Sequence, residues 1–215
     1  TSIGVAKYIH HNETKDTTKR PLKSLYLGPK TNYQSPKGKK VTYDDVAKLI
    51  KDRKIVAIFQ GGSEAGPRAL GNRSILYDPT DLKGKDHVNT VKGREWYRPF
   101  AGTILQEYQH EYFDMKNLKE SPFMMYAVNV KNDKLPAITH IDKTCRIQTL
   151  TKEQNPHYYN LIESFRKLTG VPVLFNTSLN LSGDCINETI EDALISLEKS
   201  KIDYLYLPEQ QLLIS

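Results

Sequence analysis

The chain has 215 residues, of which 38% are hydrophobic, and a formal net charge of +6. This size allows one large domain with a buried core, and no apolar run is long enough to span a bilayer. The first residues lack the basic and then apolar pattern of a secretory signal, so we expect a cytoplasmic location. The positive charge fits either a nucleic acid or a ligand with several phosphate groups, and composition does not separate the two.

The two cysteines, Cys145 and Cys185, lie far apart and outside any CxxC or Cys/His spacing. This pattern indicates neither a disulfide framework nor a structural zinc site. We expect both to be reduced, semi-buried thiols.

Residues 1–14 place Ile3, Ala6 and Ile9 at helical spacing, with Val5 as an alternative to Ala6. The predicted helix begins abruptly, and we interpret it as the end of a preceding element. Residues 15–40 are rich in Lys, Pro, Thr and Gly, which is typical of a solvated linker or a wrapped arm.

The folded domain is predicted to begin at Val41. Thr42 can cap a helix to about Lys51, and the β-branched run 55–59 predicts a strand. Further strands are predicted at 74–77, 102–105, 123–130, 171–175 and 204–207, and further helices at 155–168 and 192–199. This alternation predicts an α/β domain, although the long loops argue against a plain doubly wound sheet.

A glycine-rich segment, QGGSEAGPRALGNRSIL, follows the first predicted strand. Its glycines let backbone N–H groups approach a ligand, and Arg68 and Arg73 supply forked donors suited to phosphate or carboxylate. The alternative is a tight surface turn whose arginines pair with nearby acids. We favour an anion-binding loop, and neither a P-loop nor a GxGxxG motif is present.

The segment KGREWYRPF places Lys92, Arg94 and Arg98 around Trp96 and Tyr97. Cations beside aromatic rings can hold a flat anionic ligand or line an RNA channel. The alternative is a solvated basic turn.

In THIDKTCRIQT, the side chains of His140, Asp142, Arg146 and Gln148 recur at even spacing along a predicted strand. They would share one face, which must meet solvent or a polar site. No Ser or Cys stands nearby to make His140 a catalytic base, so we assign it none.

In VPVLFNTSLN, a predicted apolar strand ends in Asn176, Thr177, Ser178 and Asn180. Polar side chains at the carboxyl end of a buried strand often form the ligand site of an α/β sheet. Local capping or a loop turn is the alternative, and this segment alone does not separate them.

Together these four segments resemble the carboxyl-terminal domain of the O-carbamoyltransferases that include nodulation, cephamycin and tobramycin enzymes, over about residues 41–208. The resemblance implies an α/β, YrdC/Sua5-like domain with a twisted mixed sheet and flanking helices. Such a domain binds ATP and carbamoyl phosphate and forms carbamoyl-adenylate. Residues 1–14 then look like the last helix of a missing Kae1-like transfer domain, residues 15–40 like a linker or arm, and residues 41–215 like the carbamoyltransferase C-terminal domain.

The resemblance also assigns residues. It gives catalytic roles to Arg68, Lys92 and Arg146, and it makes Ser178 and Asn180 the pair that orients phosphate or carbamoyl oxygens. The full set expected to contact substrate or nucleotide is Arg68, Lys92, Arg94, Arg98, Arg146, Asn176, Ser178 and Asn180. Magnesium is expected with ATP, held mainly by phosphate oxygens. Glu64 is left open between binding magnesium and orienting Arg68.

The partners implied are ATP, carbamoyl phosphate, the Kae1-like domain with its iron or other divalent metal, and an acceptor small molecule that carries a hydroxyl. We expect no membrane partner and no nucleic acid. Two alternatives remain, namely a basic RNA-binding module of the same fold and a threonylcarbamoyl-adenylate synthase that uses bicarbonate and threonine.

Overall fold

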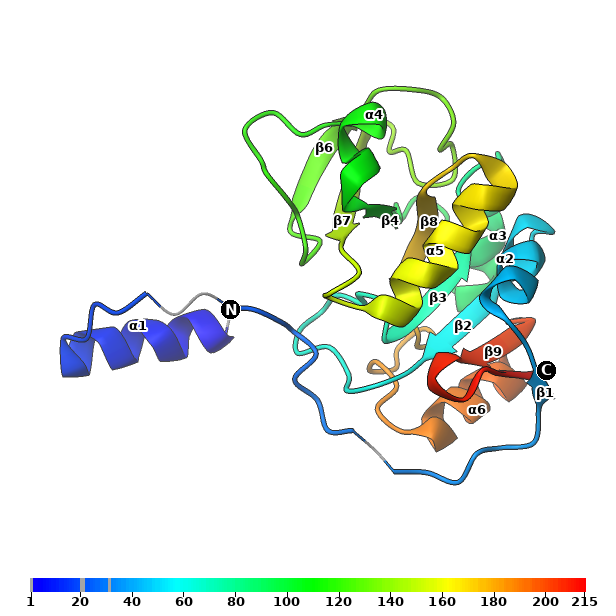
Figure 1. Cartoon of the computed structure of the whole chain (residues 1–215), viewed down its shortest axis with the longest axis horizontal. Coiled ribbons are helices and arrows are strands. Elements are labelled where there is room, and N and C mark those ends of the chain that lie inside the picture. Colours follow the sequence, from blue (N-terminus) through cyan, green and yellow to red (C-terminus); the bar gives the residue numbers. More distant parts are fainter. Residues whose placement is uncertain (1, 20–21, 31) are drawn as a thin grey trace.

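A ten-stranded mixed sheet runs through the computed structural model, which describes residues 2–19, 22–30 and 32–215 (Figure 1). Its strands are β1 (Lys39–Lys40), β2 (Val56–Phe59), β3 (Arg73–Tyr77), β4 (Ala101–Leu105), β5 (Phe113–Asp114), β6 (Tyr126–Val130), β7 (Thr144–Leu150), β8 (Val173–Ser178), β9 (Tyr204–Leu207) and β10 (Leu212–Ile214). Their spatial order is β1-β10-β9-β2-β3-β8-β4-β7-β6-β5. The pairs β2/β9 and β4/β7 are parallel and the other neighbours are antiparallel, so the predicted mixed α/β sheet is confirmed.

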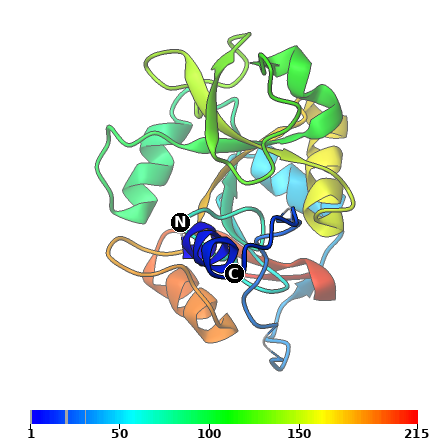
Figure 2. The ribbon, with the colours of Figure 1, turned by 90° about the vertical axis from the view of Figure 1, so that its left-hand side faces the viewer.

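The described residues form helices α1 (Ser2–Thr14), α2 (Tyr43–Lys51), α3 (Gly84–Lys92), α4 (Gln109–Tyr112), α5 (Pro156–Thr169) and α6 (Ile190–Lys199), with 3₁₀ turns η1 (Gln106–Tyr108) and η2 (Pro208–Gln210). Helices other than α1 cover both sides of the sheet (Figure 2). Figure 2 shows α2 and α5 on one side and α3 and α6 on the other. The core lies between these layers, where α2 buries Val46 and Ile50 and α5 buries Leu161 and Phe165.

Local signals mark the helix ends. Thr42 and Thr189 each form a capping box with the Asp three residues later, which satisfies backbone N–H groups that the first turn leaves free. Asn155 caps α5 with Pro156 at its first position, and Gly170 ends the helix in the left-handed conformation. The predicted helices that begin near these residues are therefore confirmed.

Two predicted strands start too early. Residues 123–130 yield β6 only from Tyr126, and residues 139–149 yield β7 only from Thr144. Met124 and Lys143 have φ values of 53° and 62°, so turns precede both strands. His140 and Asp142 therefore lie in a turn and do not continue the face that carries Arg146, which corrects the prediction for that segment.

The strand predicted at 171–175 is displaced toward its polar end. It extends as β8 to Ser178, because Asn176, Thr177 and Ser178 pair with β3. Neither α3 nor β10 was predicted from the sequence. Because α3 extends to Lys92, this lysine lies on the last turn of a helix and not in a solvated basic turn.

The two cysteines have different environments. Both are free thiols, but Cys145 is buried in β7 and Cys185 is exposed. The prediction that both are semi-buried is therefore wrong.

Helix α1 projects away from the sheet (Figure 1) and has no buried residue. Its exposed side chains include Val5, Tyr8 and Ile9. Within the described residues, no helix combines the length and apolarity that crossing a membrane requires.

The arm between α1 and the sheet contacts the glycine-rich loop. Leu25 accepts a backbone hydrogen bond from Ala65 at 2.7 Å, and the N–H of Gly28 donates to the carbonyl of Ser63 at 3.0 Å. The side chains of Leu25 and Tyr26 pack against a small apolar cluster of Leu70, Ala101 and Met124. The arm is therefore fastened to the loop that connects β2 to β3.

Gly71 provides a test of this loop. It has a φ of 109°, and a Cβ there would overlap the buried ring of Tyr158. Gly71→Ala should lower the free energy of unfolding by about 2 kcal/mol or more, through backbone strain plus overpacking. Urea unfolding measures this. Gly66→Ala is the matched control, since Gly66 has a φ of 140° and open space where a Cβ would lie, and an equal loss in both variants would contradict the overlap.

Candidate functional site

Glu64 organises the glycine-rich loop from inside. One carboxylate oxygen, Oε1, accepts backbone N–H groups from Leu70 at 2.6 Å and Asn72 at 2.9 Å. The side chain is buried, and burial raises its pKa while these N–H groups lower it. Among the described residues Glu64 forms no ion pair with Arg68, so it shapes the loop that carries Arg68 and does not contact its guanidinium.

Arg73 is fully buried and serves the fold. Its Nη1 donates to the Gln60 carbonyl at 2.6 Å, and Nε and Nη2 reach the carbonyls of Asn187 and Glu188 at 3.0 and 3.2 Å. Its guanidinium carbon lies 3.7 Å from the centre of the Phe59 ring. Because its donors are taken up by backbone carbonyls, the prediction that this arginine binds an anion is wrong.

The other four predicted arginines, Arg68, Arg94, Arg98 and Arg146, converge on one pocket of about 260 Å³, which we call the arginine pocket. It is lined by Pro67, Arg68, Ala69, Arg94, Arg98, Pro99, Phe100, Ala101, Met124, Arg146, Asn176, Thr177 and Ser178. The structure thus brings six of the eight expected contact residues together from the glycine-rich loop, the segment after α3, β7 and β8. Lys92 and Asn180 are the two that lie outside it.

The arginine pocket has excess positive charge. The Nε atoms of Arg68 and Arg146 are buried and have no hydrogen-bond partner within the described part of the chain. Burial, and then the charge of Arg68, lower the pKa of Arg146. Burial also lowers the pKa of Arg94, with Arg98 the next cause. Neighbouring guanidinium groups that keep buried donors without a partner are suited to an anion with several charges.

Phe100 is a pocket residue to which the sequence patterns assigned no role. The guanidinium carbon of Arg94 lies 4.2 Å from the centre of its ring, and Arg94 Nε donates to Asn89 at 2.8 Å. These contacts hold Arg94 in place, whereas Arg98 pairs with Glu95 at 2.8 Å in a more exposed position. The signal in the sequence that could have indicated this contact is that Phe100 follows Arg94 within the same basic segment.

Lys92 fastens the end of β8 from outside the pocket. Its Nζ donates to the Ser178 carbonyl, to the Asn180 carbonyl at 2.9 Å and to Asn180 Oδ1 at 3.1 Å. The Asn180 side chain also accepts a hydrogen bond from the Ser178 hydroxyl and donates to the Asp184 carbonyl. Lys92 and Asn180 therefore position Ser178, whose side chain reaches the pocket.

His140 and Asn176 support the pocket walls. His140 Nε2 lies 2.9 Å from the Phe100 carbonyl and Nδ1 lies 3.1 Å from the Thr144 hydroxyl, so both ring nitrogens have partners. Asn176 donates to the Ala69 carbonyl at 3.2 Å, while its buried Oδ1 has no partner among the described residues. His140 has a structural position, consistent with no role as a base.

The family follows from comparison with known proteins. Residues 47–213 match the model of the carbamoyltransferase C-terminus. The chain is 44% identical over 171 residues to nodulation protein NolNO of Sinorhizobium fredii and 34% identical over 190 residues to nodulation protein U of Rhizobium tropici, covering 75% and 85% of this chain. The chain therefore belongs to the carbamoyltransferase C-terminus family. It spans 25% and 32% of the length of these two relatives.

Solved structures show the same fold. Full-length HypF in a phosphate- and nucleotide-bound form matches 79% of this chain and 23% of its own, with a TM-score of 0.56 at 21% identity. The Sua5 protein of P. abyssi, an H234A/Y235A variant, matches 78% and 48% with a TM-score of 0.56 at 14% identity. These likenesses confirm the YrdC/Sua5-like fold.

Arg68 and Arg73 belong to the same glycine-rich segment, but Arg68 lines the arginine pocket and Arg73 is fully buried. The same substitution at both positions therefore distinguishes a ligand-binding role from a structural one. Arg73→Met leaves several buried carbonyls unpaired and should lower the free energy of unfolding by about 3 kcal/mol or more. Arg68→Met removes a charge that repels Arg146 and should change stability by less than about 0.5 kcal/mol. Chemical denaturation of both variants measures the difference, and equal losses would contradict these assignments.

Proposed function

We propose that this domain uses ATP and carbamoyl phosphate to form carbamoyl-adenylate, as part of an O-carbamoyltransferase that modifies a hydroxyl of a small molecule. The observation that carries the proposal is the arginine pocket, where four guanidinium groups converge beside the end of β8. Membership of the carbamoyltransferase family supports a carbamoyl group as the group that is activated beside these anion-binding side chains. HypF, described in a phosphate- and nucleotide-bound form, indicates that the fold is compatible with such ligands.

In the proposed reaction, carbamoyl phosphate is first hydrolysed to carbamate and phosphate. A carbamate oxygen then bonds to the α-phosphorus of ATP while the bond to the bridging oxygen breaks, and pyrophosphate leaves. Negative charge develops on the phosphoryl oxygens, so fixed cations supply the stabilisation and no protein nucleophile is needed. We assign this role to Arg68 and Arg146, with Arg94 and Arg98 binding phosphate and Ser178 orienting an oxygen.

Magnesium would arrive with ATP and be held mainly by phosphate oxygens. Within residues 2–19, 22–30 and 32–215, no cluster of three His, Cys, Asp or Glu side chains could hold a metal by itself. We propose that transfer to the acceptor belongs to a preceding Kae1-like domain with iron or another divalent metal.

The arginine pocket predicts the effect of removing Arg146. Charge-assisted hydrogen bonds contribute roughly 1.5–3 kcal/mol, so Arg146→Met should weaken magnesium-ATP binding about tenfold to a hundredfold. Calorimetry measures binding, and pyrophosphate release with mass spectrometry of carbamoyl-adenylate measures turnover. Turnover that requires carbamoyl phosphate supports the proposal, whereas turnover with bicarbonate and threonine favours the synthase. Failure to bind ATP, together with salt-dependent RNA binding, would overturn it.

Lys92 predicts a pH dependence of stability. Burial, and then the charge of Arg94, lower its pKa to about 7, whereas an unfolded lysine titrates near 10.4. Between about pH 7 and pH 9 the unfolded chain therefore holds a proton that the folded chain lacks, and the free energy of unfolding should rise with pH. Urea unfolding across this range should show a smaller rise for Lys92→Met. An equal change for Lys83→Met, which alters an exposed lysine, would contradict the assignment.

A further inference from the structure

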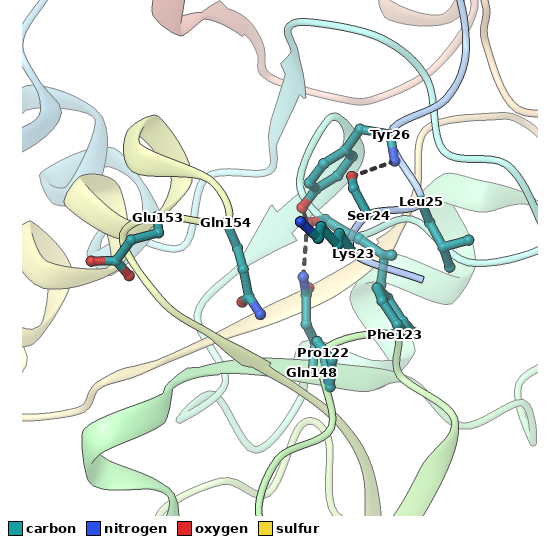
Figure 3. Close-up of a pocket in the computed structure, with 10 residues that line it drawn as sticks. Lys23, Ser24, Leu25, Tyr26, Pro122, Phe123, Gln148, Glu153 and Gln154 are labelled. Carbon is teal, nitrogen blue, oxygen red and sulfur yellow. Dashed lines mark hydrogen bonds between the residues drawn. The ribbon is translucent and has the colours of Figure 1, made fainter. Parts of the chain in front are cut away.

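The turn before β7 carries polar side chains that the proposed function does not use. Along β7 itself, Arg146 lines the arginine pocket, and Gln148 lines a second pocket beside the arm (Figure 3). The Gln148 amide is already paired, since it accepts from the Thr103 hydroxyl at 2.9 Å and donates to the Leu70 carbonyl at 3.0 Å. The part of this segment that still needs an explanation is therefore the turn at residues 140–144.

Three side chains of this turn form a chain of hydrogen bonds that ends at the wall of the arginine pocket. The Thr144 hydroxyl lies 2.7 Å from Asp142 Oδ1 and 3.1 Å from His140 Nδ1. On the other side of the ring, His140 Nε2 lies 2.9 Å from the carbonyl oxygen of Phe100. Phe100 lines the arginine pocket, and its ring contacts the guanidinium of Arg94. The imidazole thus connects the turn that begins β7 to the residue that precedes β4.

The directions of these hydrogen bonds determine the protonation state of His140. A carboxylate only accepts, so the single proton of the Thr144 hydroxyl points at Asp142, and the hydroxyl oxygen can only accept from Nδ1–H. The Phe100 carbonyl also only accepts, so Nε2 must carry a proton as well. Both ring nitrogens are donors only in the imidazolium form. His140 is therefore a cation in this arrangement.

The charges around His140 make this protonation sensitive to pH. Hydrogen bonds from Thr144, and then the charge of His140, lower the pKa of Asp142, so its carboxylate stays ionised and favours the imidazolium. The other charged side chains on the surrounding elements are Lys143 on the same turn, Arg146 on β7, and Arg94, Glu95 and Arg98 before β4. Because Glu95 pairs with Arg98, the cations prevail and oppose a further positive charge.

The segment that carries Arg94 and Arg98 is held by its carbonyl groups. Asn89 donates to the carbonyls of Trp96 and Arg98 at 3.2 and 3.3 Å, and Arg94 donates to that of Pro99 at 3.0 Å. These donors belong to α3 and to the segment itself. The bond from His140 instead ties the segment to the turn that leads into the strand of Arg146.

We propose that His140 is a positioning residue that acts in its protonated form, holding the segment of Arg94 and Arg98 in place beside the strand of Arg146 for anion binding. This inference rests on the proposed function. A histidine ordinarily changes its charge between pH 5 and 8. Once the ring has lost a proton, one of its nitrogens faces an acceptor without an N–H, and one of the two hydrogen bonds is lost. Anion binding should then weaken.

Nuclear magnetic resonance tests the protonation state in the unaltered chain. In long-range ¹H–¹⁵N correlation spectra at about pH 6, both ring nitrogens of His140 should have the chemical shifts of protonated nitrogens. A ring with one protonated and one unprotonated nitrogen at this pH would overturn the proposal. This measurement needs no substitution, so it does not depend on whether a variant folds.

Calorimetry of magnesium-ATP binding from about pH 5.5 to pH 8.5 tests the role in the pocket. His140→Gln keeps one donor for the Phe100 carbonyl but no charge, as the neutral ring does. It should raise Kd about fivefold to tenfold at the acid end and less than about twofold at the alkaline end, where the unaltered chain has lost the same bond. Titration of ATP and of Lys92 affects both chains and cancels in this ratio.

Matched variants separate the hydrogen bonds from a general loss of packing. Thr144→Val removes the acceptor of Nδ1–H and should show the same dependence on pH as His140→Gln. Thr144→Ser keeps the hydroxyl, and His157→Gln alters a histidine that contacts Tyr43 outside the pocket, so both should stay within about twofold of the unaltered chain throughout.

The outcomes distinguish this inference from the proposed function. A ratio of Kd values that is the same at every pH means that His140 has only a structural role, which overturns the inference and leaves the proposed function intact. If the unaltered chain binds no magnesium-ATP at any pH, the proposed function fails and this inference fails with it. Ratios for His140→Gln and Thr144→Val that fall together as the pH rises support the positioning role.

Discussion

The burial of Arg73 is the constraint on which the rest of the site depends. A buried guanidinium is stable only if its donors are satisfied, and here backbone carbonyls of the glycine-rich loop and of the segment before α6 meet it. Arg73, in the glycine-rich segment, and Asn187, in the segment before α6, are 114 residues apart in sequence. One side chain therefore fixes the mutual position of the loop that carries Arg68 and the region that follows β8.

A second buried side chain, that of Lys92, has a similar role at the end of β8. Lys92 gathers the carbonyls of Ser178 and Asn180, and burial keeps it away from solvent. The cations inside the pocket differ in one respect, since Arg68 and Arg146 meet few protein acceptors. The satisfied side chains of Arg73 and Lys92 thus fix the loop that carries Arg68 and the end of β8 that carries Ser178, and a fixed position of this kind is what preorganised electrostatic binding requires.

Features that depend on local chemistry were predictable from the sequence, such as the Asn155 cap and the Gly170 end of α5. Strand boundaries were less predictable because they depend on distant partners, and the polar residues through Ser178 looked like a loop but pair with β3. The motifs identified the residues that reach the arginine pocket. Spacing alone could not distinguish Arg68 from Arg73, because only the folded chain brings distant carbonyls to Arg73, whereas Arg68 donates to the carbonyl of the adjacent Pro67.

The arm and the glycine-rich loop behave as one structural unit. A Cβ on Gly28 would overlap Ser63, and a Cβ on Gly62 would overlap the carbonyl of Gly28, so the two backbones approach as closely as glycine permits. The Tyr26 hydroxyl donates to the Leu70 carbonyl at 2.7 Å, and burial raises its pKa to about 12, which keeps it a donor. Any displacement of the arm must therefore move the loop that carries Arg68 as well.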